Sequence, residues 1–213
     1  MKKKGLAAIG IIGIIAAVAV VLIGFYVVAH NSIVKLENEV DTKASDIKTQ
    51  LQRRADLIPN LVSTVQGYVK HEQGVIDSIT EARKEISGAT TIKEMSAAND
   101  KLNSALQSLN VIIENYPDLK ASQNFINLQD ELAGTENRIA TARKDYNEAV
   151  KSYNNKISTI PTSIIAGMMG KEKKDYFEVS DQSKIEVPEV NFNEATGGES
   201  KTDSDKWEKL LAY

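Results

Sequence analysis

The chain has 213 residues, of which 42% are hydrophobic, 6% aromatic and 26% charged. This length suits one ordinary domain with appendages and excludes a second large domain. The formal net charge of −3 gives no overall positive field for a polyanion, so nucleic acid is not expected as a ligand. Because the chain has no cysteine and only two histidines, disulfides, thiolate zinc sites, iron–sulfur clusters and thiol nucleophiles are excluded.

An apolar segment at residues 6–29 predicts an N-terminal transmembrane helix. It runs for about 24 residues without a charged or strongly polar side chain, which is ~36 Å of helix and enough to cross a bilayer. Lys2, Lys3 and Lys4 precede this segment, whereas the first basic residue after it is Lys35. By the positive-inside rule we expect a cytoplasmic N-terminus, a single membrane pass and a translocated remainder.

A cleaved signal peptide is the alternative interpretation of the same segment. A basic start and an apolar stretch are common to both, and Val27, Val28 and Ala29 form an acceptable cleavage site. The apolar region of a signal peptide is usually about 7 to 15 residues long, and this one is longer. We therefore expect an uncleaved anchor over residues 1–30.

Residues 33–160 carry apolar side chains at alternating spacings of three and four, which is typical of helices packed along their length. Four successive stripes are present, at 33–51, 61–86, 92–116 and 125–157. A helix with one apolar stripe buries it against partner helices. The pattern predicts an all-α protein in which the transmembrane helix is followed by an elongated antiparallel four-helix bundle.

The boundary between the first two helices is predicted at Pro59. Asp56 is expected to cap the second helix, with proline in its first turn, where the missing N–H costs nothing. A continuous helix that is kinked at Pro59 is the alternative, because no glycine or loop composition separates the two segments.

The other helix boundaries are predicted from glycine, threonine and proline. Gly88 is expected to end the second helix, and Thr90 or Thr91 to cap the third. Pro117 ends the third helix, because the residue before a proline disfavours the helical conformation, and Pro161 ends the fourth.

Charged residues on these helices are expected to form a polar network in the bundle. The predicted members are Arg53, Arg54, Asp56, His71, Glu72, Glu81, Arg83, Glu136, Arg138 and Arg143. Arg53 and Arg54 stand near a predicted helix C-terminus, where the helix dipole and Asp56 favour cations. Residues of the fourth helix are expected to pair with Arg53, Glu81 or Arg83, which fixes the register of the helices. Asn99 and Gly134 are further packing or register candidates.

At His71 and Glu72 a histidine and a carboxylate are neighbours in the sequence. Glu72 falls on the three-and-four spacing of the apolar stripe, so it is expected to face the inside of the bundle. A di-iron site in a helical bundle needs carboxylates from several helices and two Glu-x-x-His patterns, which this sequence lacks. We therefore expect Glu72 to pair with a cation of a neighbouring helix, and no metal or other cofactor. A metalloprotein or enzyme that uses His71, Glu72 and Glu136 is the alternative.

No catalytic constellation can be assembled from the remaining residues. The sequence contains no Ser–His–Asp arrangement, phosphate-binding glycine loop or dinucleotide fingerprint. We expect a protein that is not an enzyme and has no small-molecule substrate.

Two regions follow the predicted bundle. Residues 164–170 are apolar but too short to cross a bilayer; we expect them to pack under the bundle, and contact with lipid headgroups through the lysines at 171–174 is the alternative. Tyr176 and Phe177 are expected to dock on the bundle.

Residues 179–213 are polar and acidic and are predicted to form a largely disordered tail. Within it, Trp207, Leu210 and Leu211 resemble a short motif that docks on a partner; a terminus without a partner is the alternative.

Several ordered motifs of this chain are shared with one family. They are QLQRRADLIPNLV at 50–62, GYVKHE at 67–72, EAR at 81–83, ENYPDLKA at 114–121, GTENRIA at 134–140, YN at 146–147 and 153–154, and YF at 176–177. In these motifs, residues 30–178 closely resemble the LemA family of bacterial membrane proteins. The resemblance implies one N-terminal transmembrane helix, a soluble four-helix bundle and no established catalytic residues. It also implies an N-terminus outside the cell, whereas the charges at Lys2 to Lys4 indicate the opposite, and we follow the charges.

These observations predict a membrane-anchored, non-catalytic interaction or scaffold protein of the bacterial envelope. Its parts are an anchor at 1–30, a LemA-like bundle at 31–178 and an acidic tail at 179–213. The expected partners are the inner-membrane bilayer, through residues 6–29, and an unidentified envelope protein; the bundle is expected on the extracytoplasmic side. The alternatives are a lipid-contacting module and, less favoured, a metal-binding bundle around His71 and Glu72.

Overall fold

The computed structural model describes residues 2–69 and 71–178, with side chains from residue 12 onward. Chain contacts divide the protein into two units, Met1–Val179 and Ser180–Tyr213, and every described helix belongs to the first. The predicted disordered tail lies outside the described residues. Within them the secondary structure is helical, without a strand, which confirms the all-α fold class.

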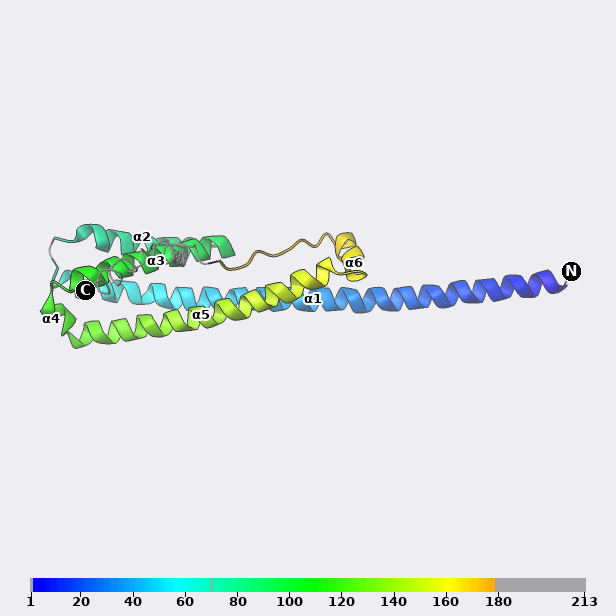
Figure 1. Ribbon diagram of the computed structural model, residues 1–213, viewed down its shortest axis with the longest axis horizontal. Helices are drawn as coiled ribbons and strands as arrows, with labels where there is room; N and C mark the ends of the chain where they lie inside the picture. Colours follow the sequence, from blue (N-terminus) through cyan, green and yellow to red (C-terminus); the bar gives the residue numbers. More distant parts are fainter. Residues whose placement is uncertain (1, 70, 179–213) are drawn as a thin grey trace, which may run out of the picture. The chain divides into compact units, whose positions relative to one another are not determined.

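Helix α1 (Lys2–Gln66) is one continuous helix of 65 residues. Side chains 12–28 are all exposed, whereas Ala29 and Ile33 begin a buried stripe. The apolar part of α1 is long and hydrophobic enough to cross a membrane, and only 6% of it is buried, so it does not serve as a core helix there. Figure 1 shows α1 extending alone beyond the other helices. The candidate membrane span and the first helix of the bundle are therefore one rod.

The predicted break at Pro59, with Asp56 as its N-cap, is wrong. Pro59 lies inside α1, and because it has no N–H the carbonyl of Ala55 loses its usual helical donor. Arg83 Nε of the following helix donates to this carbonyl at 3.1 Å. A donor from a neighbouring helix thus replaces the missing one, and the chain turns only at residues 67–72.

Helices α2 (Gln73–Gly88) and α3 (Ile92–Ile113) form a hairpin. Gly88 is the last residue of α2, as predicted, and Thr91 caps α3. The Thr91 hydroxyl accepts from Glu94 N at 3.2 Å, and the Glu94 carboxylate accepts from Thr91 N at 3.0 Å, which completes a capping box.

A short helix, α4 (Pro117–Lys120), separates α3 from α5 (Gln123–Ser158), where the sequence predicted a single boundary. Pro117 begins α4 because proline is favoured at the first helical position. Helix α5 packs antiparallel along α1 (Figure 1). Its stripe is buried as predicted, including Phe125, Ile139 and Tyr153.

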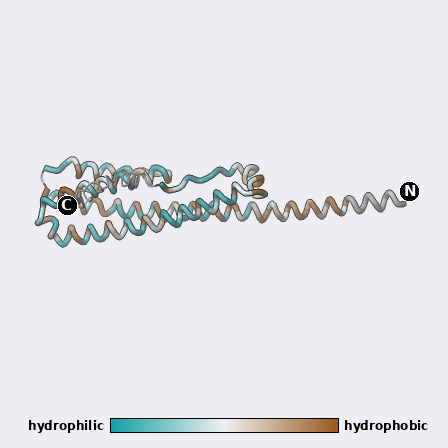
Figure 2. The backbone as a smooth tube through the Cα atoms, viewed as in Figure 1, coloured by the Kyte–Doolittle hydropathy of each residue, from teal (hydrophilic) through white to brown (hydrophobic). Residues whose placement is uncertain are grey.

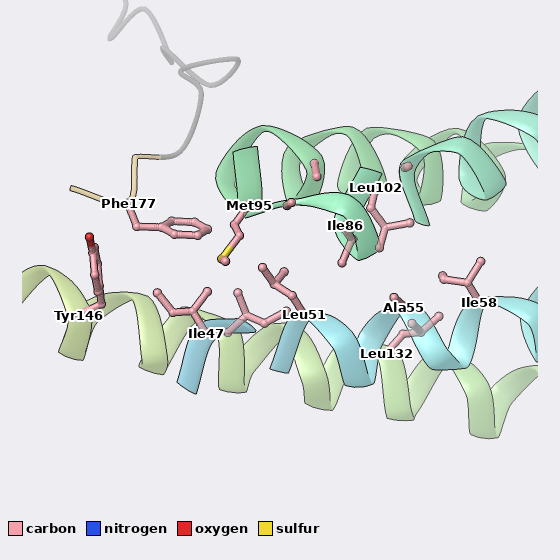
Figure 3. Close-up of a cluster of buried hydrophobic side chains, with 14 of the residues drawn as sticks. Ile47, Leu51, Ala55, Ile58, Ile86, Met95, Leu102, Leu132, Tyr146 and Phe177 are labelled. Atoms are coloured by element: carbon pink, nitrogen blue, oxygen red, sulfur yellow. The ribbon is translucent and has the colours of Figure 1, made fainter. Parts of the chain in front are cut away.

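The core lies where the α2–α3 hairpin rests on the α1–α5 pair. Figure 3 shows Ile86 of α2 and Leu102 of α3 pointing toward Leu51 and Ala55 of α1. The predicted stripes are buried or half-buried with one exception: Tyr68 is exposed, because α1 continues past the predicted break and Tyr68 falls in the turn.

Helix α6 (Thr162–Met168) ends the bundle beside α1 and α5. It is closed by a Schellman motif in which Lys171 N donates to Ala166 O at 3.0 Å and Gly170 N donates to Gly167 O at 3.1 Å. Gly170 has a φ of 64°, which glycine adopts without a side-chain penalty. Residues 171–178, which we call the strap, then run back over the bundle (Figure 1). Phe177 is buried, as predicted, whereas Tyr176 is exposed.

Candidate functional site

A groove of about 510 Å³ lies between α3 and α5, with α1 as its floor. Its apolar lining residues are Leu61, Leu106, Leu109, Phe125, Leu132 and Ala133, and its polar ones are Arg54, Asn103, Gln107, Asn110, Gln129 and Glu136. Gln129 Nε2 donates to Asn110 Oδ1 at 3.1 Å, from α5 to α3. Helices α3 and α5 both contact α1 and approach each other less closely, which leaves this groove open.

Arg54 is the buried cation of the groove floor, with 4% of the residue exposed. Its Nη1 donates to Asn99 Oδ1 of α3 at 2.8 Å and to the Glu136 carboxylate of α5. Burial lowers the pKa of Arg54, and the charge of Glu136 acts in the opposite direction. The guanidinium stays charged in a protein, so this one side chain ties α1 to α3 and α5.

The lining of the groove combines apolar side chains with neutral amides. Its lining residues include no serine, threonine, histidine or tyrosine, and the Glu136 carboxylate already accepts from Arg54. Apolar side chains from three helices and amide groups along α3 and α5 match a ligand with one apolar and one polar side. An amphipathic helix has this character and is commonly bound in grooves of this kind.

A smaller hollow of about 280 Å³ lies on α1 and α5. It brings together two of the predicted network residues, Arg53 and Arg138, beside Asp130 and Glu131. Gly134 also lines it, and a Cβ added there would meet nothing within 4 Å. Close approach of a neighbouring helix is therefore not the reason for this glycine.

Two members of the predicted polar network, Arg54 and Glu136, form an ion pair between α1 and α5. Each had been assigned a different partner. Arg54 was expected to pair with Asp56 at a helix end; α1 does not end there, and Asp56 accepts from Gln52 Nε2 at 2.9 Å. Asn99 is buried and accepts from Arg54, which gives it a packing and register position as expected.

Apart from Arg53 and Arg138, which line the smaller hollow, the other predicted network residues are not brought together. Glu81 pairs with Lys84 of its own helix at 3.1 Å. Arg83 donates to the Ala55 carbonyl, not to a carboxylate. Arg143 is half-buried on α5, and no ion pair of it is present among residues 12–69 and 71–178.

His71 and Glu72 lie in the turn before α2, not on a helix as predicted, because α1 extends to Gln66. His71 is exposed, and Glu72 is half-buried at the N-cap of α2 without a side-chain capping bond. The expected pairing of Glu72 with a cation of a neighbouring helix is not found in the described part of the chain. That part also has no group of three or more His, Asp or Glu side chains arranged to hold a metal ion.

Asn147 and Asn154, which belong to the two YN motifs but had no predicted role, hold the strap to α5. Asn154 Nδ2 donates to Lys174 O at 2.9 Å, and its Oδ1 accepts from Lys174 N at 2.9 Å. Asn147, two turns earlier, makes the same pair of bonds with Phe177, at 3.1 and 2.9 Å. A side-chain amide presents a donor and an acceptor as a peptide group does, so each asparagine pairs with the strap like a neighbouring strand.

A tyrosine precedes each of these asparagines and is buried. The Tyr146 hydroxyl donates to Asp175 O at 2.8 Å, and burial raises the pKa of Tyr146 to about 12. Figure 3 shows Tyr146 close to Phe177 of the strap. The Tyr–Asn pair repeated at a seven-residue spacing is the sequence signal that identifies these contacts.

A charged cluster at the other end of the strap has no comparable sequence signal. Lys171 Nζ lies 2.6 Å from a Glu37 carboxylate oxygen, and Lys174 Nζ lies 3.7 Å from Glu37 and from Asp41. The hydrogen bond from Lys171 lowers the pKa of Glu37, and the same bond raises the pKa of Lys171. The predicted docking residues Trp207, Leu210 and Leu211 lie outside the described residues.

Comparison of this sequence with known proteins identifies its family. The LemA family profile matches residues 43–192, so the match continues beyond Glu178, where we expected it to end. The chain is similar to the protein LemA of Metamycoplasma hominis, with 26% identity over 163 residues that cover 76% of this chain and 74% of that protein.

Magnetosome proteins are also similar to this chain. The magnetosome protein MamQ 2 of Paramagnetospirillum magneticum is 24% identical over 199 residues, which cover 80% of this chain and 70% of that protein. The magnetosome protein MamQ of Magnetospirillum gryphiswaldense is 22% identical over 196 residues, with the same coverage. Since the family profile matches more than half of the residues, this chain belongs to the LemA family.

Proposed function

We propose that this protein is a membrane-anchored, non-catalytic scaffold of the bacterial envelope, which binds an amphipathic helix of another envelope protein in the groove between α3 and α5. The observation that carries the proposal is the continuity of α1. One helix provides both the candidate membrane span and the surface on which α2, α3 and α5 pack. A partner bound to the bundle is therefore held at a fixed distance from the bilayer.

The chemistry of the groove supports this type of partner. Four of its leucine and phenylalanine side chains are buried in the base of the groove, whereas Leu106 is half-buried and Ala133 is exposed. The exposed part of this apolar lining gains free energy when a partner removes it from water. Neutral amides at Asn103, Gln107, Asn110 and Gln129 supply hydrogen bonds without demanding a charged partner. The Gln129–Asn110 bond is between exposed side chains, so a bound helix replaces it at small cost.

Photo-cross-linking in cells tests the proposal. p-Benzoylphenylalanine is introduced at Gln107 on α3, at Gln129 on α5 and, as a control, at exposed Lys151 of α5 away from the groove. We expect the same discrete protein adduct from both groove positions and none from Lys151. Adducts of equal yield at the control, or none from the groove, would contradict the proposal.

A groove-filling variant makes the test specific. Ala133 lines the groove and its side chain is exposed, so Ala133→Trp is expected to abolish the adduct while the helical content stays unchanged. Ala121→Trp, an exposed position outside the groove, is the matched control and should retain the adduct. A deletion of residues 180–213 distinguishes binding by the bundle from binding by the tail. Loss of the adduct in this deletion would assign binding to the tail.

A further inference from the structure

Helix α6 is the end of the bundle nearest to the candidate membrane span. Helix α5 runs toward the span and the strap runs back from it, so the turn between them, which contains α6, faces the bilayer side (Figure 1). Ala29 is the first buried side chain described in α1, directly after the exposed apolar residues 12–28. The bundle therefore begins where the apolar part of α1 ends.

The membrane boundary on α1 is marked by aromatic side chains. Tyr26 and His30 contact each other with 5.9 Å between ring centroids, and tyrosine is favoured at the headgroup level of a bilayer. Lys171, which follows α6, binds Glu37, about 12 Å along α1 from Ala29. The headgroup layer is roughly 5–7 Å thick on each side, and α6 lies on the span side of Lys171. These positions place α6 at the level of the headgroups.

Helix α6 and Ile160, which lies two residues before it, expose apolar side chains that the bundle does not cover. Ile160, Ile164 and Met168 are 84%, 64% and 75% exposed, while Ile165 and Ala166 on the other side are buried. The three exposed residues are four apart, which puts Ile164 and Met168 on one face of the helix. Figure 2 shows this hydrophobic end of the bundle next to the hydrophobic length of α1. Helix α6 and the apolar part of α1 therefore lie close to each other at this end of the bundle.

The charges around α6 allow contact with lipid. Alone, the acidic residues of α1 near the span would repel an anionic bilayer, but Lys171 and Lys174 pair with Glu37 and Asp41. Residues 35–41 and 171–174 together hold four cations and four anions: Lys35, Lys171, Lys173, Lys174, Glu37, Glu39, Asp41 and Glu172. A balanced cluster is neither repelled nor strongly attracted by anionic lipid, so apolar insertion is the main contribution to binding.

We propose that α6, together with Ile160 just before it, is a membrane-interface foot, which inserts Ile160, Ile164 and Met168 at the boundary between headgroups and acyl chains beside α1. The bilayer that α1 enters is the occupant of the exposed face, because that face lies at the end of the bundle where the apolar part of α1 begins. With two points of contact, α1 and α6, the bundle is held in a fixed orientation on the membrane. This contact does not depend on a partner in the α3–α5 groove.

Single-cysteine labelling tests the foot in the full chain, which has no native cysteine. Ile164→Cys and Met168→Cys are labelled with an environment-sensitive nitrobenzoxadiazole dye and reconstituted into phosphatidylcholine vesicles, with or without lipid that carries a doxyl quencher near the headgroup. Val111→Cys, a 72% exposed apolar position on α3, is the matched control. For the dye at positions 164 and 168 we expect a blue shift of the emission maximum and a loss of emission intensity through doxyl quenching. For the dye at position 111 we expect neither change.

Two results would overturn the foot. Emission at 164 and 168 equal to that at 111 would mean that α6 stays in water. A blue shift without doxyl quenching would mean that protein, such as a second copy of the chain, covers α6. Vesicles with added phosphatidylglycerol should give the same quenching as neutral ones, and a requirement for anionic lipid would contradict the apolar mechanism. Because no partner protein is present, failure here leaves the groove-binding function untouched.

Discussion

Arg54 shows how one side chain determines the arrangement of several helices. Its guanidinium lies on α1 and donates to Asn99 on α3 and to Glu136 on α5, so three helices meet at one buried charge. Taking a guanidinium out of water is costly, and the ion pair offsets this cost only while the partner is present. The two partners differ in exposure: the Arg54 side chain is 5% exposed and that of Glu136 is 39% exposed.

Substitutions of the two partners should therefore have unequal effects. Glu136→Ala leaves a buried cation with one neutral acceptor, and we expect a loss of about 3 kcal/mol in the free energy of unfolding. Arg54→Met removes the buried charge and leaves a carboxylate that water reaches, for which we expect a loss of about 1 kcal/mol. Denaturant unfolding of the full chain in detergent, followed by circular dichroism, measures both; equal losses would show that the pair is not asymmetric.

Glu94 predicts a stability change with pH. Backbone hydrogen bonds from Thr90 and Thr91 lower the pKa of Glu94 from 4.5 to about 2. A carboxyl group with a lowered pKa in the folded state stabilises that state above its unfolded pKa and loses this effect as the pH falls to the folded value. We expect Glu94→Gln to be less stable than the parent at pH 7, with the difference disappearing between pH 4.5 and 2. Unfolding midpoints across this range test it, and a difference independent of pH would contradict it.

At the scale of the element, α1 is continuous because a side chain of α2 donates a hydrogen bond to the carbonyl that Pro59 leaves without a donor. Pro59 leaves the Ala55 carbonyl without its helical donor, and Arg83 of α2 donates to it. The contact also fixes α2 against α1, since Arg83 and Ala55 are on different helices. The strap is attached in a similar way, by the side-chain amides of Asn147 and Asn154 and not by a strand.

A double-mutant cycle on Pro59 and Arg83 tests this account. Arg83→Leu leaves the Ala55 carbonyl without a donor, and we expect a loss of about 1–2 kcal/mol in the free energy of unfolding. In a Pro59→Ala background the residue at 59 supplies its own N–H to that carbonyl, so the same substitution should cost about 1 kcal/mol less. Additive effects of the two substitutions in denaturant unfolding would show that Arg83 does not compensate for the proline.

For the whole molecule, the decisive property is that one helix belongs to both the candidate membrane span and the bundle. The bundle cannot tilt independently of the span without bending α1, which has no break over its 65 residues. A second contact through α6 would restrict rotation about the α1 axis. For the proposed function, the side of the membrane on which the bundle lies would determine which partners it meets.

The charge distribution predicts that side. Lys2 to Lys4 favour a cytoplasmic N-terminus, so the bundle should be accessible from outside the inner membrane. Asn155 is exposed on α5, and Asn155→Cys introduces a cysteine in a chain that has none. We expect a membrane-impermeant maleimide to label this variant in cells with a permeabilised outer layer and an intact inner membrane. Protection until the inner membrane is lysed would reverse the topology.

Local sequence patterns identified most of the elements. The three-and-four spacing located the buried stripes of α1, α2, α3 and α5, because a helix presents a residue to the same side every 3.6 positions whatever it packs against. The helix end at Gly88 and a threonine cap at residue 90 or 91 were equally readable, since each acts on the backbone within one turn. The participation of Glu94 in that cap was not predicted. The apolar length of α1 indicated the candidate span for the same reason.

Contacts between distant residues were decided only by the tertiary structure. Pro59 is locally a helix breaker. The helix tolerates this proline because Arg83, 24 positions later in the sequence, reaches the Ala55 carbonyl when the two helices pack. Arg54 had a plausible local partner in Asp56, but the fold placed Glu136 and Asn99 against it. The α3–α5 groove has no local signature, and the apolar stretch at 164–170 did not by itself show which of its side chains stay exposed. Local pattern fixes which face of a helix is apolar; only the packing of the helices determines which faces are covered and which remain open to a partner or a membrane.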